Sequence, residues 1–370
     1  MAQPVPLDAP PRWAAGLTVM VGLAAAVIVV AGLRSASGIV GPAMLALVLT
    51  IAVHPLRHRL ARLKLPGWAV SLVCVVVVYL ILIGLSIALV IATARFATLL
   101  PTYKPEFNAL VHDAASWLSN VGVGDEQIAK ISGSITLERL ALVLGELLGA
   151  LASVLSNLVF ILSLVLFLAM DATGFPSQLA TMAEARAPLA AALIGFAIGT
   201  RRYLLVSTVF GLIVACIDTV ALALFAIPVP LLWGLLAFIT NYIPNIGFII
   251  GLVPPAVLAL LEGGFGLFIA VTLVYSVINV VIQSVIQPKF VGDAVGLSTS
   301  LTFMSLVFWA WVLGALGALL AIPLSLLAKA ILVDVEPRSR WLTPLLSNRT
   351  EPEPEPEPEP DPAAGPGRQR

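Results

Sequence analysis

The stretch "YIPNIGFIIGLVPPAVLALLEGG", residues 242–264, is apolar enough to lie in a membrane, yet it contains three helix-breaking prolines. Pro244, Pro254 and Pro255 each lack the backbone N–H that an α-helix uses for its hydrogen bonds. Backbone groups left unpaired cannot face hydrocarbon, so breaks at the first proline and at the proline pair must lie inside protein or beside a water-filled cavity. The stretch therefore predicts a broken helix, and an ordinary helix with kinks near its ends is the alternative.

Small and polar residues accompany the first of these prolines. Asn241 and Asn245 flank Pro244, and Gly247 and Gly251 would let another backbone segment come close. Discontinuous helices in transporters expose helix ends and free carbonyls to polar solutes or ions. We expect these five residues to line a solute or ion pathway.

The composition predicts an integral membrane protein with an all-α, polytopic fold. Of the 370 residues 60% are hydrophobic and 11% are charged, and the mean hydropathy is +1.05, so the chain cannot present a mostly polar surface to water. About 20 apolar residues cross the hydrocarbon, which predicts about eight spans. The apolar runs are 13–33, 35–53, 67–94, 147–170, 203–227, 229–261, 263–288 and 294–328.

Two of these runs, 229–261 and 294–328, are longer than one span needs. Each is either a single span or a hairpin of two half-spans. We expect broken or re-entrant helices in the C-terminal half of the chain.

Asp218 is a charged residue near the middle of the run 203–227. An intramembrane acid is costly, because the bilayer interior solvates charge poorly, and such residues are therefore often functional. Ser207, Gly211 and Ala215 share its helix face, so the carboxyl group should point toward the helix bundle. It is a candidate for proton or cation coupling, and a structural hydrogen-bonding acid is the alternative.

Asn279, Gln283 and Gln287 recur every four residues and form one polar stripe on a helix, directly before Pro288. Amide groups in hydrocarbon need partners, so the stripe should face other helices or a solute path. Hydrogen bonding between helices and lining of a pathway remain equal alternatives.

Charge sets the expected orientation and domain organisation. The strongest basic cluster, at 57–64, marks a cytoplasmic loop, which places both termini in the cytoplasm. We expect a membrane transporter domain at 1–350, with an extracytoplasmic amphipathic helical segment at 95–146 and an amphipathic segment on the cytoplasmic side at 175–202. The alternating Glu-Pro tail, 351–370, is expected to be disordered and acidic, either as a spacer or as a docking segment.

Three stretches carry a resemblance to a known family. They are "NYIPNIGFIIGLVPP" (241–255), "VIQPKFVGDAVGLS" (285–298) and "LVFWAWVLGALGALLAIPLSLLAK" (306–329). Together they resemble the autoinducer-2 exporter (AI-2E) family of bacterial membrane permeases. The resemblance implies a transporter of the cytoplasmic (inner) membrane that forms oligomers, with export of small solutes in some members and exchange of sodium or lithium for protons in others.

The resemblance also transfers to particular positions. The family's Pro-x-x-Gly element falls on Pro244 and Gly247, and a later proline falls on Pro288. Family members often carry a glutamate shortly before that proline, whereas this chain has Gln283, which cannot carry a titrating proton. If that glutamate couples transport in other members, coupling in this chain must use Asp218 or be absent.

The leading hypothesis is a secondary transporter, which exports a small polar solute of the autoinducer-2 kind by alternating access. A sodium (lithium)/proton antiporter is one alternative, and a passive channel or a non-transporting membrane scaffold is another. No phosphate-binding glycine loop occurs, so the chain is not expected to use ATP. The expected partners are a small polar solute, a proton or sodium ion, the lipid bilayer and further copies of the chain. We expect no enzymatic activity, cofactor, metal or nucleic acid.

Overall fold

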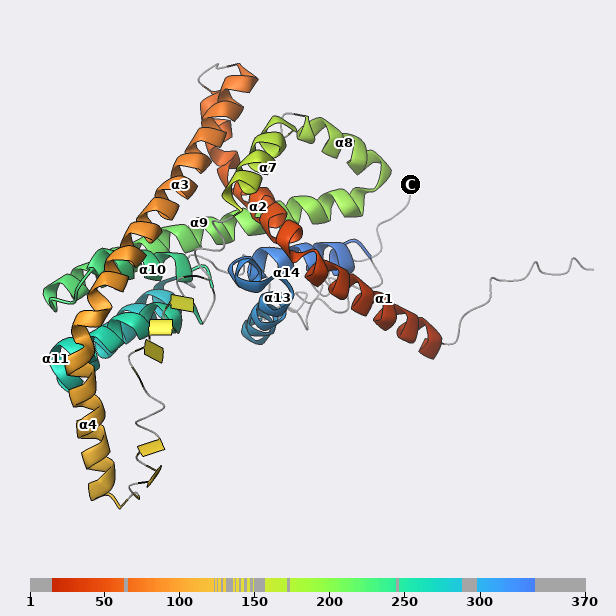
Figure 1. The fold of residues 1–370 in the computed structure, drawn as a ribbon. Helices are drawn as coiled ribbons and strands as arrows, with labels where there is room; N and C mark the ends of the chain where they lie inside the picture. The colour runs from red at the N-terminus through yellow and green to blue at the C-terminus, as the bar shows by residue number, and fades with distance from the viewer. Residues whose placement is uncertain are drawn as a thin grey trace, which may run out of the picture.

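The computed structural model describes residues 15–62, 66–122, 157–171, 174–243, 246–287 and 298–336, and scattered positions between 124 and 149. These residues form helices joined by short turns, and no strand occurs among them, which confirms the all-α prediction for this part of the chain. The α-helices are α1 (Ala15–Ser35), α2 (Ser37–Ala61), α3 (Gly67–Leu99), α4 (Lys104–Asn120), α7 (Leu158–Asp171), α8 (Phe175–Ala185), α9 (Ala187–Leu224), α10 (Pro230–Thr240), α11 (Gly247–Asn279), α13 (Thr299–Leu319) and α14 (Ala321–Lys329) (Figure 1). The 3₁₀-helix η1 (Leu100–Tyr103) and the π-helices η2 (Val280–Ile286) and η4 (Ala330–Asp334) extend three of them.

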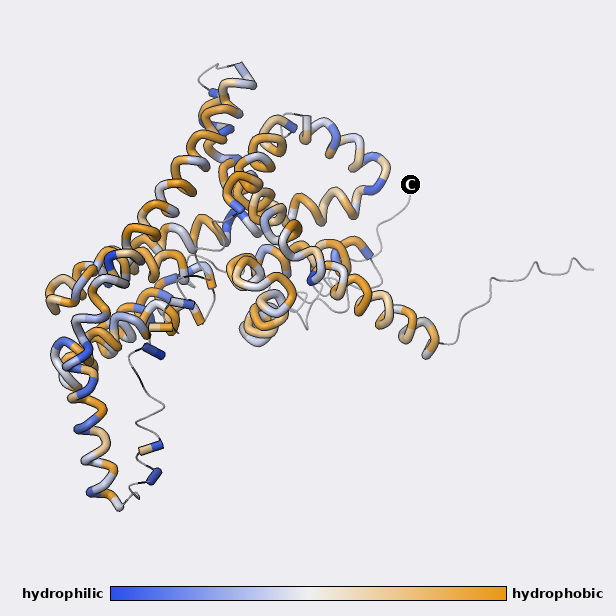
Figure 2. Tube along the Cα trace, in the orientation of Figure 1, coloured by the Kyte–Doolittle hydropathy of each residue, from blue (hydrophilic) through white to orange (hydrophobic). Residues whose placement is uncertain are grey.

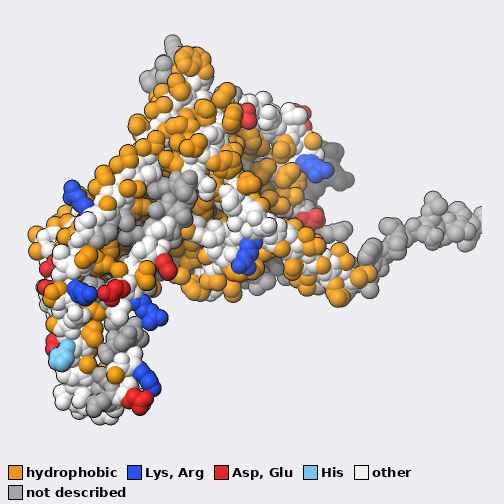
Figure 3. Space-filling view, viewed as in Figure 1, with side chains coloured by type: hydrophobic (Ala, Val, Ile, Leu, Met, Phe, Trp, Pro, Cys, Tyr) orange, Lys and Arg blue, Asp and Glu red, His pale blue; other side chains and the backbone are white. Residues whose placement is uncertain are grey.

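Within the described residues, five helical stretches are long and apolar enough to cross a membrane: Ser37–Arg57, Gly67–Asn120, Ala187–Leu224, Gly247–Gln283 and Ser300–Leu319. Three shorter apolar helices are Met20–Ser35, Leu158–Asp171 and Pro230–Thr240. Hydrophobic side chains cover much of the visible surface in Figure 3, which suits contact with lipid but not with water. The chain is thus a helical multi-pass membrane protein, and the number of eight spans stays a prediction.

Helix α9 is the longest element wholly inside the described part of the chain. Its 38 residues rise about 57 Å, and in Figure 1 it runs across most of the molecule. The expected boundary between the segment 175–202 and the span 203–227 is therefore not a helix end, because α9 continues through Gly199 and across this boundary without a break. The face that carries Ser207, Gly211, Ala215 and Asp218 is buried, as the sequence predicts.

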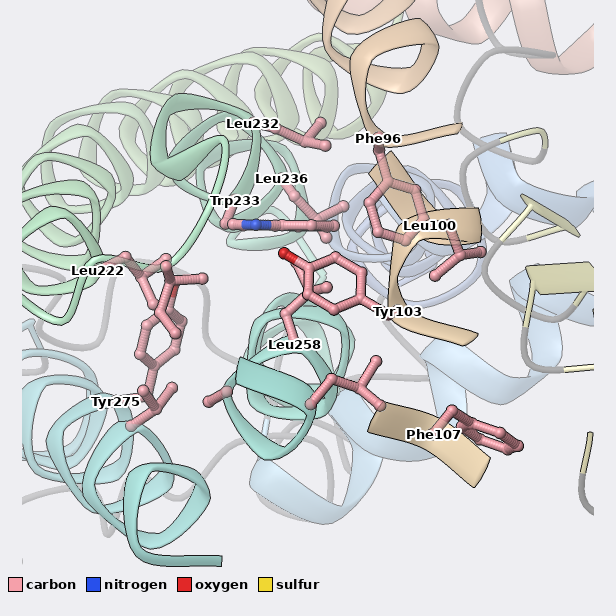
Figure 4. Packing of buried hydrophobic residues seen from close by; sticks show 14 of the residues in the cluster. Phe96, Leu100, Tyr103, Phe107, Leu222, Leu232, Trp233, Leu236, Leu258 and Tyr275 are labelled. Atoms are coloured by element: carbon pink, nitrogen blue, oxygen red, sulfur yellow. The ribbon is translucent and has the colours of Figure 1, made fainter. Parts of the chain in front are cut away.

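Helix α3 connects two hydrophobic cores. Its first half packs with α2 and α7, where Val48, Val75 and Val165 are buried in a core that α13 joins through α2. Its other end joins a core built on Trp233 and Tyr275, in which Figure 4 shows Phe96, Leu100 and Tyr103 from α3 and η1 beside residues of α10 and α11. Burial of large apolar side chains from four elements fixes α10 and α11 against the end of α3.

Helix α4 follows this core and has mixed polarity, as the blue and orange turns in Figure 2 show. Phe107 is buried, and Leu110 and Val111 pack against the same core. One apolar face therefore holds α4 to α11, while its polar face remains open. The extracytoplasmic placement of 95–146 stays a prediction.

The chain doubles back between α10 and α11. A Cβ atom on Gly247 would lie 1.9 Å from the carbonyl oxygen of Thr240, and one on Gly251 would lie 3.4 Å from the Cα of Ala237. Because glycine permits this approach, α10 and residues 247–262 pack side by side. The run 229–261 is thus a hairpin, which we call the first hairpin (230–262).

The predicted break at Pro254–Pro255 is wrong. Both prolines are buried within helix α11, which remains regular up to Gly263 and Gly264. Gly264 has a φ of 67°, which L-residues rarely adopt, so the helix bends there. The proline pair removes two hydrogen bonds but keeps a φ that suits a helix, so burial in the surrounding bundle overrides its effect.

A second hairpin, residues 299–329, is formed by α13 and α14. Helix α13 bends at Gly314, whose φ is 67°. A Cβ atom on Gly317 would lie 1.8 Å from the carbonyl oxygen of Trp309, and the Trp309 indole Nε1 donates a hydrogen bond to Ser325 Oγ at 3.0 Å. The long run 294–328 therefore also doubles back.

Candidate functional site

A small polar cavity lies where the first hairpin meets α9 and the end of α11. The volume open to the centre of a water molecule is about 10 Å³, which is room for roughly one water. Its polar wall consists of Asp218 from α9, Thr240 and Asn241 from the end of α10, and Tyr275, Asn279 and Gln283 from α11 and η2. The remaining wall consists of Val214, Ala237, Gly247, Phe248 and Gly251.

Asp218 is the charged member of this wall and is 0% exposed. Neither of its carboxylate oxygens has a hydrogen-bond partner among the described residues. The hydroxyl group of Tyr275, which lines the same cavity, also has none there. Burying a carboxylate without a partner is costly, so this geometry favours a group that binds a proton or a cation over an acid that serves a structural hydrogen bond.

The side-chain amides form a hydrogen-bonded chain along one side of the cavity. Gln283 Nε2 donates to the Oδ1 atoms of Asn279 (2.7 Å) and Asn241 (3.0 Å). Asn241 Nδ2 donates to the carbonyl oxygen of Ser207 on α9 (2.9 Å), and Asn279 Nδ2 donates to that of Tyr275 (2.9 Å). Two of these bonds, from Asn241 to Ser207 and from Gln283 to Asn241, tie the end of the first helix of the hairpin to α9 and to η2.

Close packing brings Asn241 to this position. A Cβ atom on Gly211 of α9 would lie 2.7 Å from Asn241 Nδ2, so a larger residue at 211 would displace the amide. Gly251 lines the cavity and has lost the helical partner of its carbonyl, because Pro255 has no N–H to donate to it. The second proline of the pair thus removes the ordinary α-helical donor to a cavity residue, even though it does not break the helix.

A π-helical turn separates the members of the polar stripe. In η2 each turn contains more residues than in an α-helix, so a spacing of four no longer keeps side chains on one face. Asn279 and Gln283 reach the cavity, whereas Gln287, at the end of this turn, is half-buried and does not line it. π-helical turns occur frequently at functional sites.

The structure brings together six of the residues that the sequence singles out: Asp218, Asn241, Gly247, Gly251, Asn279 and Gln283. Gln287 is the described exception. Pro244, Asn245 and Pro288 lie outside the described residues. The role of these residues in transport stays a prediction.

Two polar cavity residues are missing from the sequence prediction. Tyr275 precedes Asn279 by four residues and thus extends the amide stripe, but an aromatic residue in an apolar helix reads as core. Thr240 precedes Asn241 and donates its hydroxyl proton to the carbonyl of Leu236 (2.9 Å). The stripe spacing could have found Tyr275, whereas nothing in the pattern distinguishes Thr240.

Helices that double back beside a small polar cavity, within a bundle whose outer surface is apolar, are typical of polytopic membrane transporters. A family model described as "AI-2E family transporter" matches residues 18–336. The chain therefore belongs to the AI-2E transporter family, which confirms the resemblance seen in the sequence.

Curated relatives agree with this family. The chain is 29% identical to the AI-2 transport protein TqsA of Escherichia coli (strain K12) over 86% of this chain and 92% of TqsA. A protein of Haemophilus influenzae is 32% identical (85% and 91% covered), and YhhT of Escherichia coli (strain K12) is 27% identical (87% and 92% covered). The last two carry only a provisional transport name. The chain is thus a membrane transporter by family, and these names indicate transport rather than enzymatic activity.

Proposed function

We propose that this chain is a secondary transporter that exports a small polar solute by alternating access, with Asp218 as the group that couples export to a proton. The observation that supports this proposal is a fully buried carboxylate that has no hydrogen-bond partner among the described residues, in a cavity between the first hairpin and the long helix α9. Of the relatives, TqsA is named for autoinducer-2 transport. A small polar solute with several hydroxyl groups therefore defines the first substrate class to test.

The cavity implies a closed conformation. Room for roughly one water cannot hold a sugar-sized solute, so the walls must separate before such a solute enters. The contact between Gln283 and Asn241 joins the hairpin to η2 across this wall. We propose that this hydrogen bond opens and closes during transport, because it spans elements that are far apart in sequence while the backbone bonds within each helix stay intact.

The same volume favours a second candidate, the sodium (lithium)/proton antiporter. A dehydrated monovalent cation fits a site of this size. Asp218 and the Tyr275 hydroxyl group supply oxygen ligands of the kind that hard cations prefer. In this alternative the cation is the transported species, and Asp218 binds cation and proton in turn.

Purified protein in proteoliposomes distinguishes the candidates. We expect Asp218→Asn to lower proton-driven flux by about tenfold or more, the size of an ordinary coupling free energy between two ligands. Autoinducer-2 flux and sodium flux are measured separately under an imposed pH gradient. Loss of the first with no sodium flux in the wild type supports the exporter, and the converse supports the antiporter.

The matched control is Asp113→Asn, which changes the same functional group on the exposed part of α4. It should transport like the wild type. Proton-dependent flux that persists in Asp218→Asn, at the rate seen in Asp113→Asn, would remove Asp218 from the mechanism.

A further inference from the structure

A second, larger depression lies away from the Asp218 cavity and shares no residue with it. This groove has a volume of about 400 Å³ and lies between the end of α3 and the start of α10. Its lining consists of Arg95, Thr98 and Leu99 from α3, and Val229, Pro230 and Leu231 from the turn and first residues of α10. The groove is apolar except for one guanidinium group and one hydroxyl group.

Within the part of the chain that the structure describes, the guanidinium group of Arg95 has no acidic partner to neutralise it. Arg95 is exposed, and no carboxylate of the described residues lies within ion-pair distance of it. The neighbouring hydroxyl of Thr98 already donates to the Arg95 carbonyl at 2.8 Å. Arg95 is therefore the donor that the groove offers to an anionic ligand.

Arg95 stands at the end of an apolar stripe on the outer face of α3. The stripe repeats at three- and four-residue spacing, so its members share one helix face, and all of them are exposed: Leu80, Ile83, Ile87 and Ile91. From Leu80 to Ile91 the helix rises about 16 Å, close to one leaflet of a hydrocarbon core about 30 Å thick. An acyl chain that lies along this stripe would bring its headgroup to Arg95.

The opposite end of α3 supports a position of Arg95 at the level of the lipid headgroups. Trp68, which is 71% exposed, lies in the first turn of the helix, where an interfacial tryptophan is typical. Between Trp68 and Arg95 the helix rises about 40 Å, the thickness of a bilayer with its headgroup layers. Arg95 therefore reaches the headgroup level of one leaflet when Trp68 reaches that of the other.

The other wall of the groove is a strained turn. Ala226 and Val229 adopt left-handed φ angles of 55° and 53°, which is unusual for a β-branched residue such as Val229. The Trp233 indole Nε1 holds this turn by donating to the carbonyl of Pro228 at 3.0 Å, and the Trp233 ring packs edge-on against Phe96 of α3 at 5.2 Å. Strained backbone of this kind is frequent at sites that hold a ligand. Here Trp233 contacts both the strained turn and α3, so it holds the two walls of the groove together.

We propose that this groove binds a membrane phospholipid, with the headgroup phosphate on Arg95 and one acyl chain along the exposed stripe of α3. Charge complementarity between guanidinium and phosphate provides the polar contact. Continuity of the groove with a lipid-facing surface explains why the ligand is a lipid rather than a soluble anion. Bound there, the lipid contacts both α3 and the turn that leads into the first hairpin.

The test uses the full chain, purified in detergent, with dioleoyl phosphatidylglycerol added in known amounts and bound lipid counted by native mass spectrometry. Arg95→Gln should weaken binding about fivefold, which corresponds to the loss of one interfacial cation. The control Lys130→Gln removes another exposed base, which pairs with Glu126, and should leave binding unchanged.

A competition arm identifies the source of the phosphate. Inorganic phosphate at millimolar concentration should not displace the lipid, because it lacks the acyl chain that follows α3. Equal lipid binding by Arg95→Gln and Lys130→Gln would overturn the proposal. Complete displacement by inorganic phosphate would overturn it as well, since the groove would then be a simple anion site.

Discussion

The two hairpins use the same packing device but leave different groups unpaired. In the first, Gly247 lies against the carbonyl of Thr240, and in the second, Gly317 lies against the carbonyl of Trp309. The first hairpin borders the cavity that contains Asp218, a carboxylate with no partner among the described residues. Within the described residues of α13 and α14, by contrast, no buried side-chain oxygen or nitrogen lacks a partner.

The second hairpin is also packed by apolar contacts. Leu306 and Ala321 are buried against Ile243, which belongs to the turn of the first hairpin. The indole N–H of Trp309 in this hairpin donates its hydrogen bond to Ser325. A helix break within the bundle is therefore not itself a site. The first hairpin differs because Asp218 and the Tyr275 hydroxyl group lie beside it and have no hydrogen-bond partner among the described residues.

The largest effect that we predict concerns the shared device. Gly247→Ala and Gly317→Ala should each destabilise the protein by about 3 kcal/mol, the upper end of the cost of overpacking. In each case the added methyl group would lie within 2 Å of a carbonyl oxygen, at 1.9 Å and 1.8 Å. The thermal midpoint of the detergent-purified protein measures the loss for both variants.

Gly251→Ala separates packing from function in the first hairpin. Its added Cβ atom would lie 3.2 Å from Thr240 Oγ1 and 3.4 Å from the Ala237 Cα, which small shifts can relieve. We expect a small loss of stability, below about 1 kcal/mol, but reduced transport, because Gly251 lines the cavity. Equal thermal midpoints for Gly247→Ala and Gly251→Ala would contradict the close approach at Gly247.

Removing a polar contact should cost less stability than the two overpacking variants, and the loss should differ between the two hairpins. Gln283→Leu leaves Asn241 Oδ1 and Asn279 Oδ1 without their donor and should cost about 1–3 kcal/mol. Ser325→Ala leaves the Trp309 Nε1 unpaired and should cost about 1 kcal/mol. Flux per folded molecule in proteoliposomes should fall for Gln283→Leu and stay at the wild-type level for Ser325→Ala. A comparable loss of flux in Ser325→Ala would place the second hairpin in the transport pathway as well.

The sequence predicted the location of the cavity better than the form of the helices around it. Asp218 is conspicuous because a charge within an apolar run is costly, and the four-residue spacing identified Asn279 and Gln283. Gln287 has the same spacing but falls beyond a π-helical turn, which depends on tertiary packing rather than on a local pattern.

Helix breaks were harder to predict. A proline pair accommodated within a helix and a proline that ends one look alike in sequence, and the actual bend in α11 is at Gly264. The sequence left two alternatives for each long apolar run, a single span or a hairpin, because the length of a run does not reveal whether the chain turns back. The close approach of Gly247 to Thr240 decides this, and it depends on contacts between segments that no periodicity records.

The smallest structural effect, and the sharpest functional one, should come from Tyr275→Phe. The hydroxyl group of Tyr275 is buried at the cavity and has no partner among the described residues, so its removal breaks no protein hydrogen bond there. Stability should change by less than about 0.5 kcal/mol, since the aromatic ring keeps its packing.

Although Tyr275→Phe should leave stability unchanged, we expect it to impair transport. If the hydroxyl group contacts the ion or solute beside Asp218, Tyr275→Phe lowers flux and weakens the apparent affinity, although its thermal midpoint matches that of the wild type. Flux and affinity equal to the wild type would mean that the hydroxyl group takes no part in transport and is only tolerated in the packed interior. The proposed site would then consist of Asp218 and the side-chain amides. A purely structural role of the hydroxyl group predicts that flux and stability fall together. Lower flux at unchanged stability would therefore assign this oxygen atom to the transport site rather than to the packed core.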